Sequence, residues 1–291
     1  MKILFVIDYL TTYGEQLVLN ISSPDGTTER HTMSTRDGHE WTFDYNTPAP
    51  QTALSYHYSV QRGDTLVRTE WLVEPHRVEL RPDVLRYTLN DRWAEIPDDA
   101  YLYTSAFTDC VARRSAQTSN LKSQTTNLKS QLILKVRAPQ LRSDERLAVV
   151  GEPTYLGGWD IQKTLPMTEQ QPNEWVACLD AARLPDDVEL KFVALRDNGE
   201  VTWEEGYNRH LLLPALQKGE AVSYELAPTW FDVPAWKGAG TVIPVFSLRS
   251  EGSYGVGDFG DLKMMVDWCA KTGQRALQVL PINDTTMTHT W

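Results

Sequence analysis

Residues 1–80 alternate apolar and polar positions with a period of two, which is typical of half-buried β-strands. Turn-forming residues separate these runs, as in Ser23-Pro24-Asp25-Gly26, and no stretch has the spacing of an amphipathic helix. Short strands at this spacing predict an antiparallel, immunoglobulin-like β-sandwich, here assigned to residues 1–112. The expected strands are residues 3–7, 16–20, 40–45, 54–60 and 65–71. Residues 81–112 have a mixed pattern and are expected to form an irregular connector.

A second β-rich region covers residues 131–228 and predicts a second sandwich. Asn198-Gly199 between two of its runs favours a tight hairpin, because this pair tolerates the positive φ that such a turn requires. The expected strands are residues 132–136, 146–150, 174–179, 188–195, 201–203 and 221–226. Residues 113–130 contain most of a tandem heptapeptide, 118–124 and 125–131, with one apolar residue per copy. We interpret them as a polar linker, because two such copies cannot build a repeat fold.

Residues 229–291 have a different pattern, in which a helix lies between two strands. An apolar strand at 241–248 is followed by a helix, with Asp258 as its cap and Asp261 in its first turn, and by a second strand at 276–280. Strand, helix and strand in this order are the opening unit of an α/β domain. One such unit cannot cover both faces of its sheet, so we expect the sequence to be an incomplete piece of a larger domain.

Charge and composition exclude several classes of function. Lys and Arg number 28 and Asp and Glu 39, a net charge of −11 with no basic stripe, which disfavours nucleic acid as a partner. The longest apolar runs, such as residues 3–7, are far below the ~20 residues of a membrane span. Three scattered cysteines favour a reduced, cytoplasmic location, and the histidines lack the spacing of metal ligands. Gly255-Val256-Gly257 lacks the third glycine of a nucleotide-binding loop, so no cofactor is expected.

Tryptophan and tyrosine are unusually frequent, with ten and twelve copies against seven phenylalanines. Such aromatic side chains suit wet, flat ligands as well as cores. In the second sandwich, Trp159 follows a glycine pair, where the backbone can bend sharply, and Trp203 leaves a strand into a loop. A glucan ring presents apolar faces to aromatic side chains and a rim of hydroxyls to charged or amide groups. Trp159, Lys191, Trp203, Glu204 and Asn208 provide both kinds of contact.

The order of these motifs resembles a family 20 starch-binding module. The matching segments are 156–159, 190–192, 201–204 and 208–209. The resemblance implies that Trp159, Lys191, Trp203, Glu204 and Asn208 form an α-1,4-glucan site. The alternative is that both tryptophans are core residues and Lys191 is a solvated strand residue; Trp175, in an alternating strand, is assigned to the core.

The first sandwich resembles the same module more weakly. It lacks the Leu-Gly-x-Trp segment, and Trp71 follows Glu70 instead of preceding it. A weaker site at Glu70 and Trp71 and a pure spacer role both remain open.

A second resemblance lies in segments 244–250, 255–262 and 277–285, which are similar to the start of the 4-α-glucanotransferases of glycoside hydrolase family 77. It implies a (β/α)₈ barrel and transfer of α-1,4-glucan segments to an acceptor sugar through a pair of carboxylates. These catalytic carboxylates come from later strands, so none is expected in this chain. We assign Asp258, Asp261 and Asp284 structural roles, although Asn283 and Asp284 could line the sugar pocket.

Three hypotheses follow. In the first, the chain is part of a glucanotransferase, binds starch, glycogen or a related glucan, and catalyses nothing by itself. In the second, it is a non-catalytic glucan-binding adaptor. In the third, the pair of sandwiches binds protein partners, with the tryptophans at the interface.

Overall fold

The computed structural model describes residues 1–23, 26–47, 52–111, 130–232 and 237–280. The chain divides into two units, Met1–Val233 and Pro234–Trp291, and each is described by itself. The expected linker, apart from its last residue, lies outside the described residues, as do Asn283 and Asp284.

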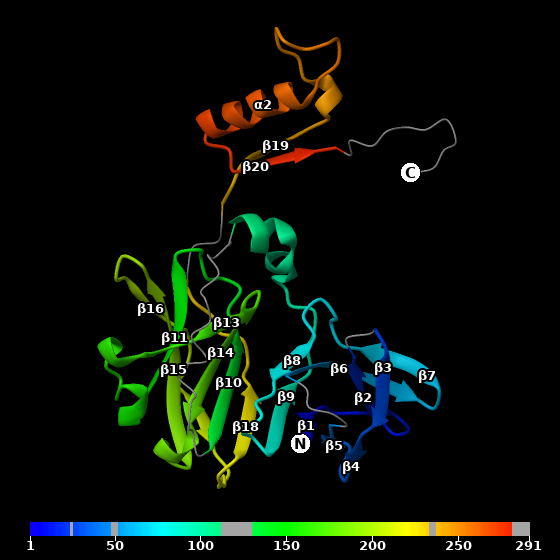
Figure 1. Cartoon of the computed structure of the whole chain (residues 1–291), viewed down its shortest axis with the longest axis vertical. Helices are drawn as coiled ribbons and strands as arrows, with labels where there is room; N and C mark the ends of the chain where they lie inside the picture. The colour runs from blue at the N-terminus through cyan, green and yellow to red at the C-terminus, as the bar shows by residue number, and fades with distance from the viewer. Residues whose placement is uncertain (24–25, 48–51, 112–129, 233–236, 281–291) are drawn as a thin grey trace. The chain divides into compact units, whose positions relative to one another are not determined.

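In the first unit, one eight-stranded sheet runs through both predicted sandwiches. Figure 1 shows β18 beside β9, where the two halves of this sheet meet. The pairing is parallel and runs from Glu220 opposite Arg86 to Tyr224 opposite Asn90. In spatial order the strands are β13 (Thr168–Gln171), β14 (Glu174–Asp180), β10 (Gln131–Arg137), β18 (Glu220–Glu225), β9 (Arg86–Arg92), β1 (Lys2–Asp8), β5 (Glu40–Asn46) and β4 (Ser34–Thr35).

Each half of the shared sheet is covered by a separate five-stranded sheet. The first contains β3 (Thr28–Thr32), β2 (Gln16–Ser22), β6 (Ala53–Arg62), β7 (Thr65–Thr69) and β8 (His76–Glu79). The second contains β12 (Leu165–Pro166), β11 (Glu145–Gly151), β15 (Asp187–Arg196), β16 (Val201–Trp203) and β17 (Arg209–Leu212). The prediction of two mainly β sandwiches is therefore confirmed. Besides the β9–β18 pair, β1–β9 and β10–β18 are also parallel.

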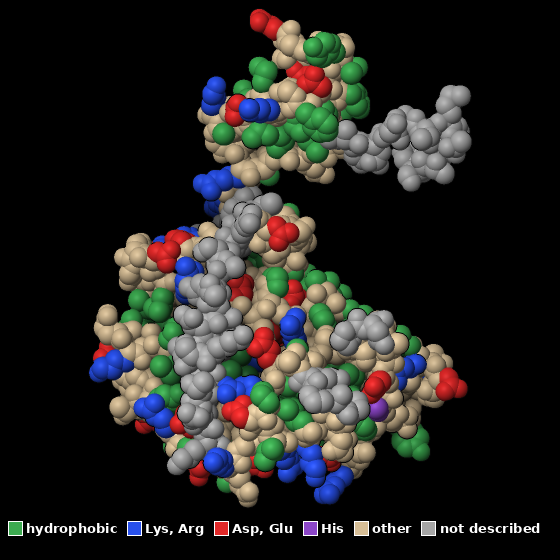
Figure 2. Space-filling view, in the orientation of Figure 1, with side chains coloured by type: hydrophobic (Ala, Val, Ile, Leu, Met, Phe, Trp, Pro, Cys, Tyr) green, Lys and Arg blue, Asp and Glu red, His purple; other side chains and the backbone are tan. Residues whose placement is uncertain are grey.

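Each sandwich has its own apolar core. Phe5, Tyr56 and Tyr87 are fully buried in the first core, and Phe192 is fully buried in the second. Trp175 is also buried in the second core, which confirms its assignment from the sequence. Figure 2 shows acidic and basic side chains interspersed over the visible face of the first unit.

The expectation of an irregular connector over residues 81–112 is wrong for β9 (Arg86–Arg92), which occupies the middle of the shared sheet. Its inward positions are Tyr87, Leu89 and Asp91. A buried aspartate interrupts the apolar period, and this is why the strand was missed. The connector itself contains a 3₁₀ helix, Ala100–Tyr103, and a π-helical turn, Ala106–Val111.

The second unit has the predicted strand, helix and strand. β19 (Gly240–Ile243) pairs in parallel with β20 (Ala276–Val279), and α2 (Phe259–Lys271) connects them. The side chain of Asp258 accepts hydrogen bonds from the amides of Gly260 and Asp261. Asp261 returns a bond to the amide of Asp258, which completes a capping box.

Short 3₁₀ turns join the strands at Thr154–Leu156, Ile161–Lys163, Ala181–Arg183 and Val245–Ser247. The last of these replaces the end of the strand predicted to reach residue 248, because Pro244 cannot donate a ladder hydrogen bond. None of the helices in the described ranges has the length and apolar character needed to cross a bilayer.

Candidate functional site

The loop that carries Trp159 depends on three successive residues with positive φ. Gly157 and Gly158 have φ of 95° and 58°, and Trp159 itself has φ of 63°. A Cβ at Gly157 would lie 2.9 Å from the carbonyl oxygen of Lys163, so only glycine fits there. The Trp159 amide donates a 3.0 Å hydrogen bond to the carbonyl of Gly151, at the end of β11. These constraints fix the position of the indole ring.

Trp203 is the last residue of β16 and pairs with Val193 of the central strand β15. Its side chain is 37% exposed, and its ring centroid lies 6.4 Å from that of Trp159, with the ring planes tilted by 41°. Trp159 also packs against the small cluster that contains Val150. The structure therefore brings together the two tryptophans that the sequence singled out, as neighbouring rings at one edge of the sandwich.

Lys191 lies on β15, and its ammonium group is held by two backbone carbonyls. Nζ donates to Glu204 O at 2.9 Å and to Gly206 O at 2.8 Å. An ammonium has three protons, so one remains for a ligand. Lys191 thus also fixes the start of the loop that follows Trp203.

Glu204 is only 3% exposed, and protein donors already occupy its carboxylate. Oε1 accepts a 2.8 Å hydrogen bond from the amide of Phe192, and Arg209 binds both carboxylate oxygens, with its shortest contact at 2.7 Å. A carboxylate in this state offers no free oxygen to a sugar. This geometry favours a positioning role for Glu204 over the direct sugar contact that the resemblance implies.

Asn208 is exposed at the end of the same loop. Its Nδ2 donates a 2.7 Å hydrogen bond to Glu189 Oε1, and among the described residues its Oδ1 has no protein donor. The amide oxygen is therefore available to a ligand. Tyr207, which precedes Asn208, is fully exposed, with a relative accessibility of 99%.

Sequence reasoning did not assign roles to Arg209 and Glu189, although Arg209 was part of the recognised motif. Both act on the site through other residues, by holding Glu204 and Asn208 respectively. An ion pair that forms across a loop leaves no periodic signal in the sequence. The sequence offered one signal for the Glu204–Arg209 pair, namely a basic residue five positions after the glutamate.

The first sandwich contains the same arrangement, in which a buried glutamate bonds to the central strand and to a basic residue. Glu70 is buried, its amide donates to Tyr58 O at 3.2 Å, and its Oε2 accepts from the Tyr58 amide at 2.6 Å. Glu204 makes both bonds with Phe192. The basic partner is His76 in place of Arg209, and each of these residues begins a strand beside the central strand of its sheet.

This correspondence favours a spacer role for the first sandwich over a weaker site at Glu70 and Trp71, the two alternatives that the sequence leaves open. Matching Glu70 to Glu204 puts Thr69, and not a tryptophan, at the position of Trp203. Trp71 instead packs edge-on against Tyr103, at a centroid distance of 5.0 Å. The connection between β2 and β3 also contains no aromatic residue to match Trp159. The first sandwich therefore lacks both rings of the site.

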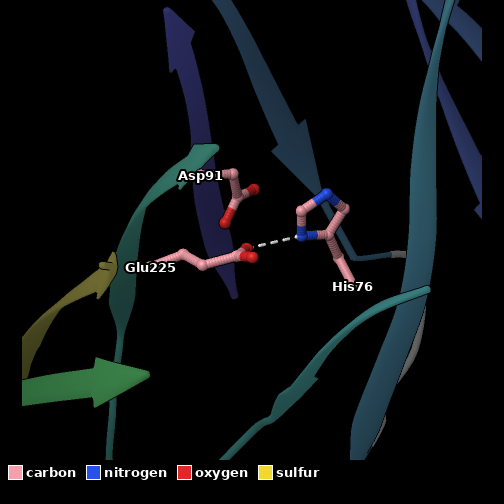
Figure 3. A group of neighbouring side chains, drawn as sticks. All are labelled: His76, Asp91 and Glu225. Carbon is pink, nitrogen blue, oxygen red and sulfur yellow. Dashed lines mark ion pairs between the residues drawn. The ribbon is translucent and has the colours of Figure 1, made fainter. Parts of the chain in front are cut away.

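A second group of polar residues lies where the two halves of the shared sheet meet. Figure 3 shows His76, Asp91 and Glu225 pointing toward one another from β8, β9 and β18. Their potential ligand atoms all lie within 4.8 Å of one another, which is close enough for a metal ion. However, His76 Nδ1 lies 2.8 Å from Glu225 and Nε2 lies 3.0 Å from Glu70. An imidazole between two carboxylates is protonated and repels a cation, so we interpret the group as an internal ion cluster.

The pKa values of this cluster follow from burial and charge. Burial lowers the pKa of His76, but the carboxylates of Glu225 and Glu70 outweigh it and raise the pKa well above 6.5. Burial raises the pKa of Glu225, but His76 and then Arg137 outweigh it and lower the pKa to about 2. Burial raises the pKa of Asp91, whose Oδ2 accepts hydrogen bonds from Tyr56 and Tyr58.

We predict that the His76 cluster stabilises the first unit most between pH 4.5 and 6.5. A raised histidine pKa stabilises fully below 6.5, and this contribution is lost as the pH rises through the folded-state pKa. The lowered pKa of Glu225 stabilises the folded state above pH 4.5, and this contribution is lost as the pH falls toward 2. His76→Gln should therefore lower the free energy of unfolding by about 3–5 kcal/mol near pH 6, because it removes the cation that lies between the buried carboxylates of Glu70 and Glu225. Chemical denaturation across pH measures this difference.

The control is His39→Gln, because the side chain of His39 is 58% exposed. Its free energy of unfolding should stay close to that of the parent at every pH. The groups that face His76 are Glu70, Glu225, Asp91, Tyr56 and Tyr58, with Arg137 behind Glu225. A His76→Gln deficit that is the same from pH 4 to 9 would contradict this account of the cluster.

Comparisons with known proteins agree with the two resemblances. Residues 129–223 match the model of a starch binding domain, and residues 243–290 match that of a 4-alpha-glucanotransferase. The chain is 25% identical to the 4-alpha-glucanotransferase DPE2 of Oryza sativa subsp. japonica, over 99% of this chain and 32% of the relative. It is 36% identical to a 4-alpha-glucanotransferase of Chlamydia trachomatis, over 25% of this chain and 14% of the relative.

Among solved structures, the family 20 module of a maltotetraose-forming amylase from Pseudomonas saccharophila is similar at 20% identity. The match covers 32% of this chain and 99% of that one, with a TM-score of 0.26. The chain spans about a third of the length of its rice relative. By the family models, residues 129–223 are similar to the family 20 starch-binding modules, and residues 243–290 are similar to the 4-α-glucanotransferases of glycoside hydrolase family 77.

Proposed function

We propose that the second sandwich binds an α-1,4-glucan across the rings of Trp159 and Trp203. The observation that carries the proposal is this ring pair, because its centroids lie 6.4 Å apart and Trp203 is 37% exposed at a sheet edge. Two tilted rings at one edge of the sandwich suit a curved chain of sugars, whose apolar faces turn toward the protein. The match to a starch binding domain supports this ligand class.

Polar groups beside the rings would form hydrogen bonds with the hydroxyl groups at the rim of the sugar. Lys191 has one ammonium proton left after its bonds to two carbonyls, and Asn208 has a free amide oxygen. One donor and one acceptor, each fixed by the protein, can orient a diol. Glu204 contributes by holding Arg209 and the loop, and does not itself contact the sugar.

The glucan is proposed to be starch, glycogen, a maltooligosaccharide or a related heteroglycan. A cytoplasmic location is also proposed, since the described cysteines, Cys178 and Cys269, are free thiols. Burial raises the pKa of the Cys178 thiol to about 11, so this thiol is unreactive at neutral pH.

We further propose that the 4-α-glucanotransferase reaction needs carboxylates other than those described in the second unit. A retaining transfer requires a nucleophilic carboxylate and an acid about 5 Å apart, both facing the sugar. Asp258 caps α2, and Asp261 accepts hydrogen bonds from the Ser253 hydroxyl and the Asp258 amide. Both carboxylates therefore stabilise the helix start and are not free for catalysis.

Trp203→Ala should weaken the binding of soluble starch by at least about tenfold, because it removes one face of the central ring pair. The association constant would be measured by the retardation of the chain in native gels that contain increasing soluble starch.

The matched control is Trp268→Ala, since Trp268 lies on α2 and is 48% exposed. This variant should be retarded like the parent. Equal retardation of Trp203→Ala and the parent would contradict the proposal and favour packing or protein contact as the role of the ring pair. A parent chain whose migration is not slowed by soluble starch would also contradict the proposal.

The chain of residues 1–291 should release no glucose and form no longer oligosaccharides from maltotriose, because two suitably placed carboxylates are required. Product analysis by chromatography over many hours provides the measurement. Transfer products that persist after repurification, and that disappear in Asp261→Asn, would show that the second unit carries catalytic groups.

A further inference from the structure

Trp230 is an exposed aromatic residue that the ring pair does not use. It follows β18 in an extended segment, and its side chain is 61% exposed. Among the described residues, its indole N–H has no hydrogen-bond acceptor. It also lies outside the region that matches the starch binding model. A large exposed aromatic ring is available for contact with a ligand.

The backbone on both sides of Trp230 is anchored in the second sandwich. Thr229 and Phe231 are each 1% exposed, and Phe231 is part of the second core. The Thr229 amide donates to Arg137 O at 2.9 Å, and the Phe231 amide donates to Gln140 Oε1 at 3.3 Å. The two neighbours of Trp230 therefore point inward, and the extended backbone turns Trp230 outward. Its exposure is built into the fold.

The same segment is attached directly to the loop of the candidate glucan site. The amide of Glu205, two residues after Trp203, donates a 2.7 Å hydrogen bond to the carbonyl of Trp230. The side chain of Trp230 thus starts from a backbone position that is bonded to the loop carrying Trp203.

Arg209 makes a second connection between the two segments. Its Nη1 donates to Ala227 O at 2.6 Å and its Nη2 to Pro228 O at 3.3 Å, while its guanidinium also binds Glu204. One arginine therefore links the loop after β16 to the segment that presents Trp230. The buried carboxylate of Glu204 fixes that arginine, so the spacing between Trp203 and Trp230 is set by an internal ion pair.

We propose that Trp230 is an additional sugar-stacking residue, which extends the glucan site so that a longer α-1,4-glucan gains a contact beyond the Trp159–Trp203 pair. The proposal rests on the proposed function and names the length of glucan chain that the site prefers. It follows from the rigid link between Trp230 and the loop that carries Trp203. We expect a short oligosaccharide to contact the ring pair alone and a longer one to reach Trp230 as well.

The test is calorimetric titration of the full chain with maltotriose and with maltoheptaose. Trp230→Ala should lower the affinity for maltoheptaose about three- to tenfold, the value of one aromatic contact, and leave the affinity for maltotriose unchanged. Trp230→Phe keeps a ring face and should retain most of the affinity for maltoheptaose. Trp230→Gln keeps a polar side chain without a ring and should behave like Trp230→Ala. Thermal unfolding of each variant establishes that the sandwich is intact.

Trp203→Ala separates the extension from the site itself. If Trp203→Ala abolishes binding of both sugars while Trp230→Ala and Trp230→Gln bind maltoheptaose like the parent, the extension is wrong and the proposed site stands. If Trp230→Ala weakens both sugars equally, Trp230 does not select for length and the proposal is overturned. If Trp203→Ala binds both sugars normally, the proposed function itself fails. Trp268→Ala is the control for loss of an exposed indole and should bind both sugars like the parent.

Discussion

A buried carboxylate beside the central strand is the interaction on which one edge of each sandwich depends. Glu204 bonds to the backbone of Phe192 and to Arg209, and Glu70 bonds to the backbone of Tyr58 and to His76. A carboxylate that is buried in this way must keep its partners, since an unpaired buried charge is very unfavourable. The loop and strand that carry these partners are therefore fixed relative to the central strand.

The two sandwiches use this constraint differently. In the second, the basic partner is Arg209, whose remaining donors reach the carbonyls of residues 227 and 228 and so join the loop after β16 to the segment after β18. In the first, the partner is His76, whose other nitrogen bonds to Glu225 of β18, a strand of the second sandwich. The buried carboxylate and its basic partner thus support the ring pair in the second sandwich, whereas in the first sandwich they connect the two sandwiches. Together with the parallel β9–β18 pair, this contact favours a structural role for the first sandwich.

The sequence predicted those features that have a local signature. Alternating strands, the Asn198-Gly199 hairpin, the Asp258 cap and the core position of Trp175 are all present. β9 was missed because Asp91, a buried acid in an ion cluster, occupies an inward position and breaks the apolar period. The shared sheet and the two ion pairs join residues far apart in the chain, and no window of sequence reports such pairing. For the same reason, Glu204 was expected at the ligand surface, whereas Arg209 and the Phe192 amide hold it inside.

The central claim is that the indole rings on the second sandwich form one glucan surface held by the Glu204–Arg209 pair. Its most direct test is an NMR titration of the isotope-labelled chain with maltoheptaose, in which the indole N–H signals are assigned by single tryptophan substitutions. The account predicts that the signals of Trp159, Trp203 and Trp230 shift together. Those of the buried Trp175 and of Trp93, a partly buried residue that packs against the first core, should not move. Shifts confined to Trp93 or to Trp268 of the second unit, or no shift of Trp159 and Trp203 at saturating sugar, would contradict it.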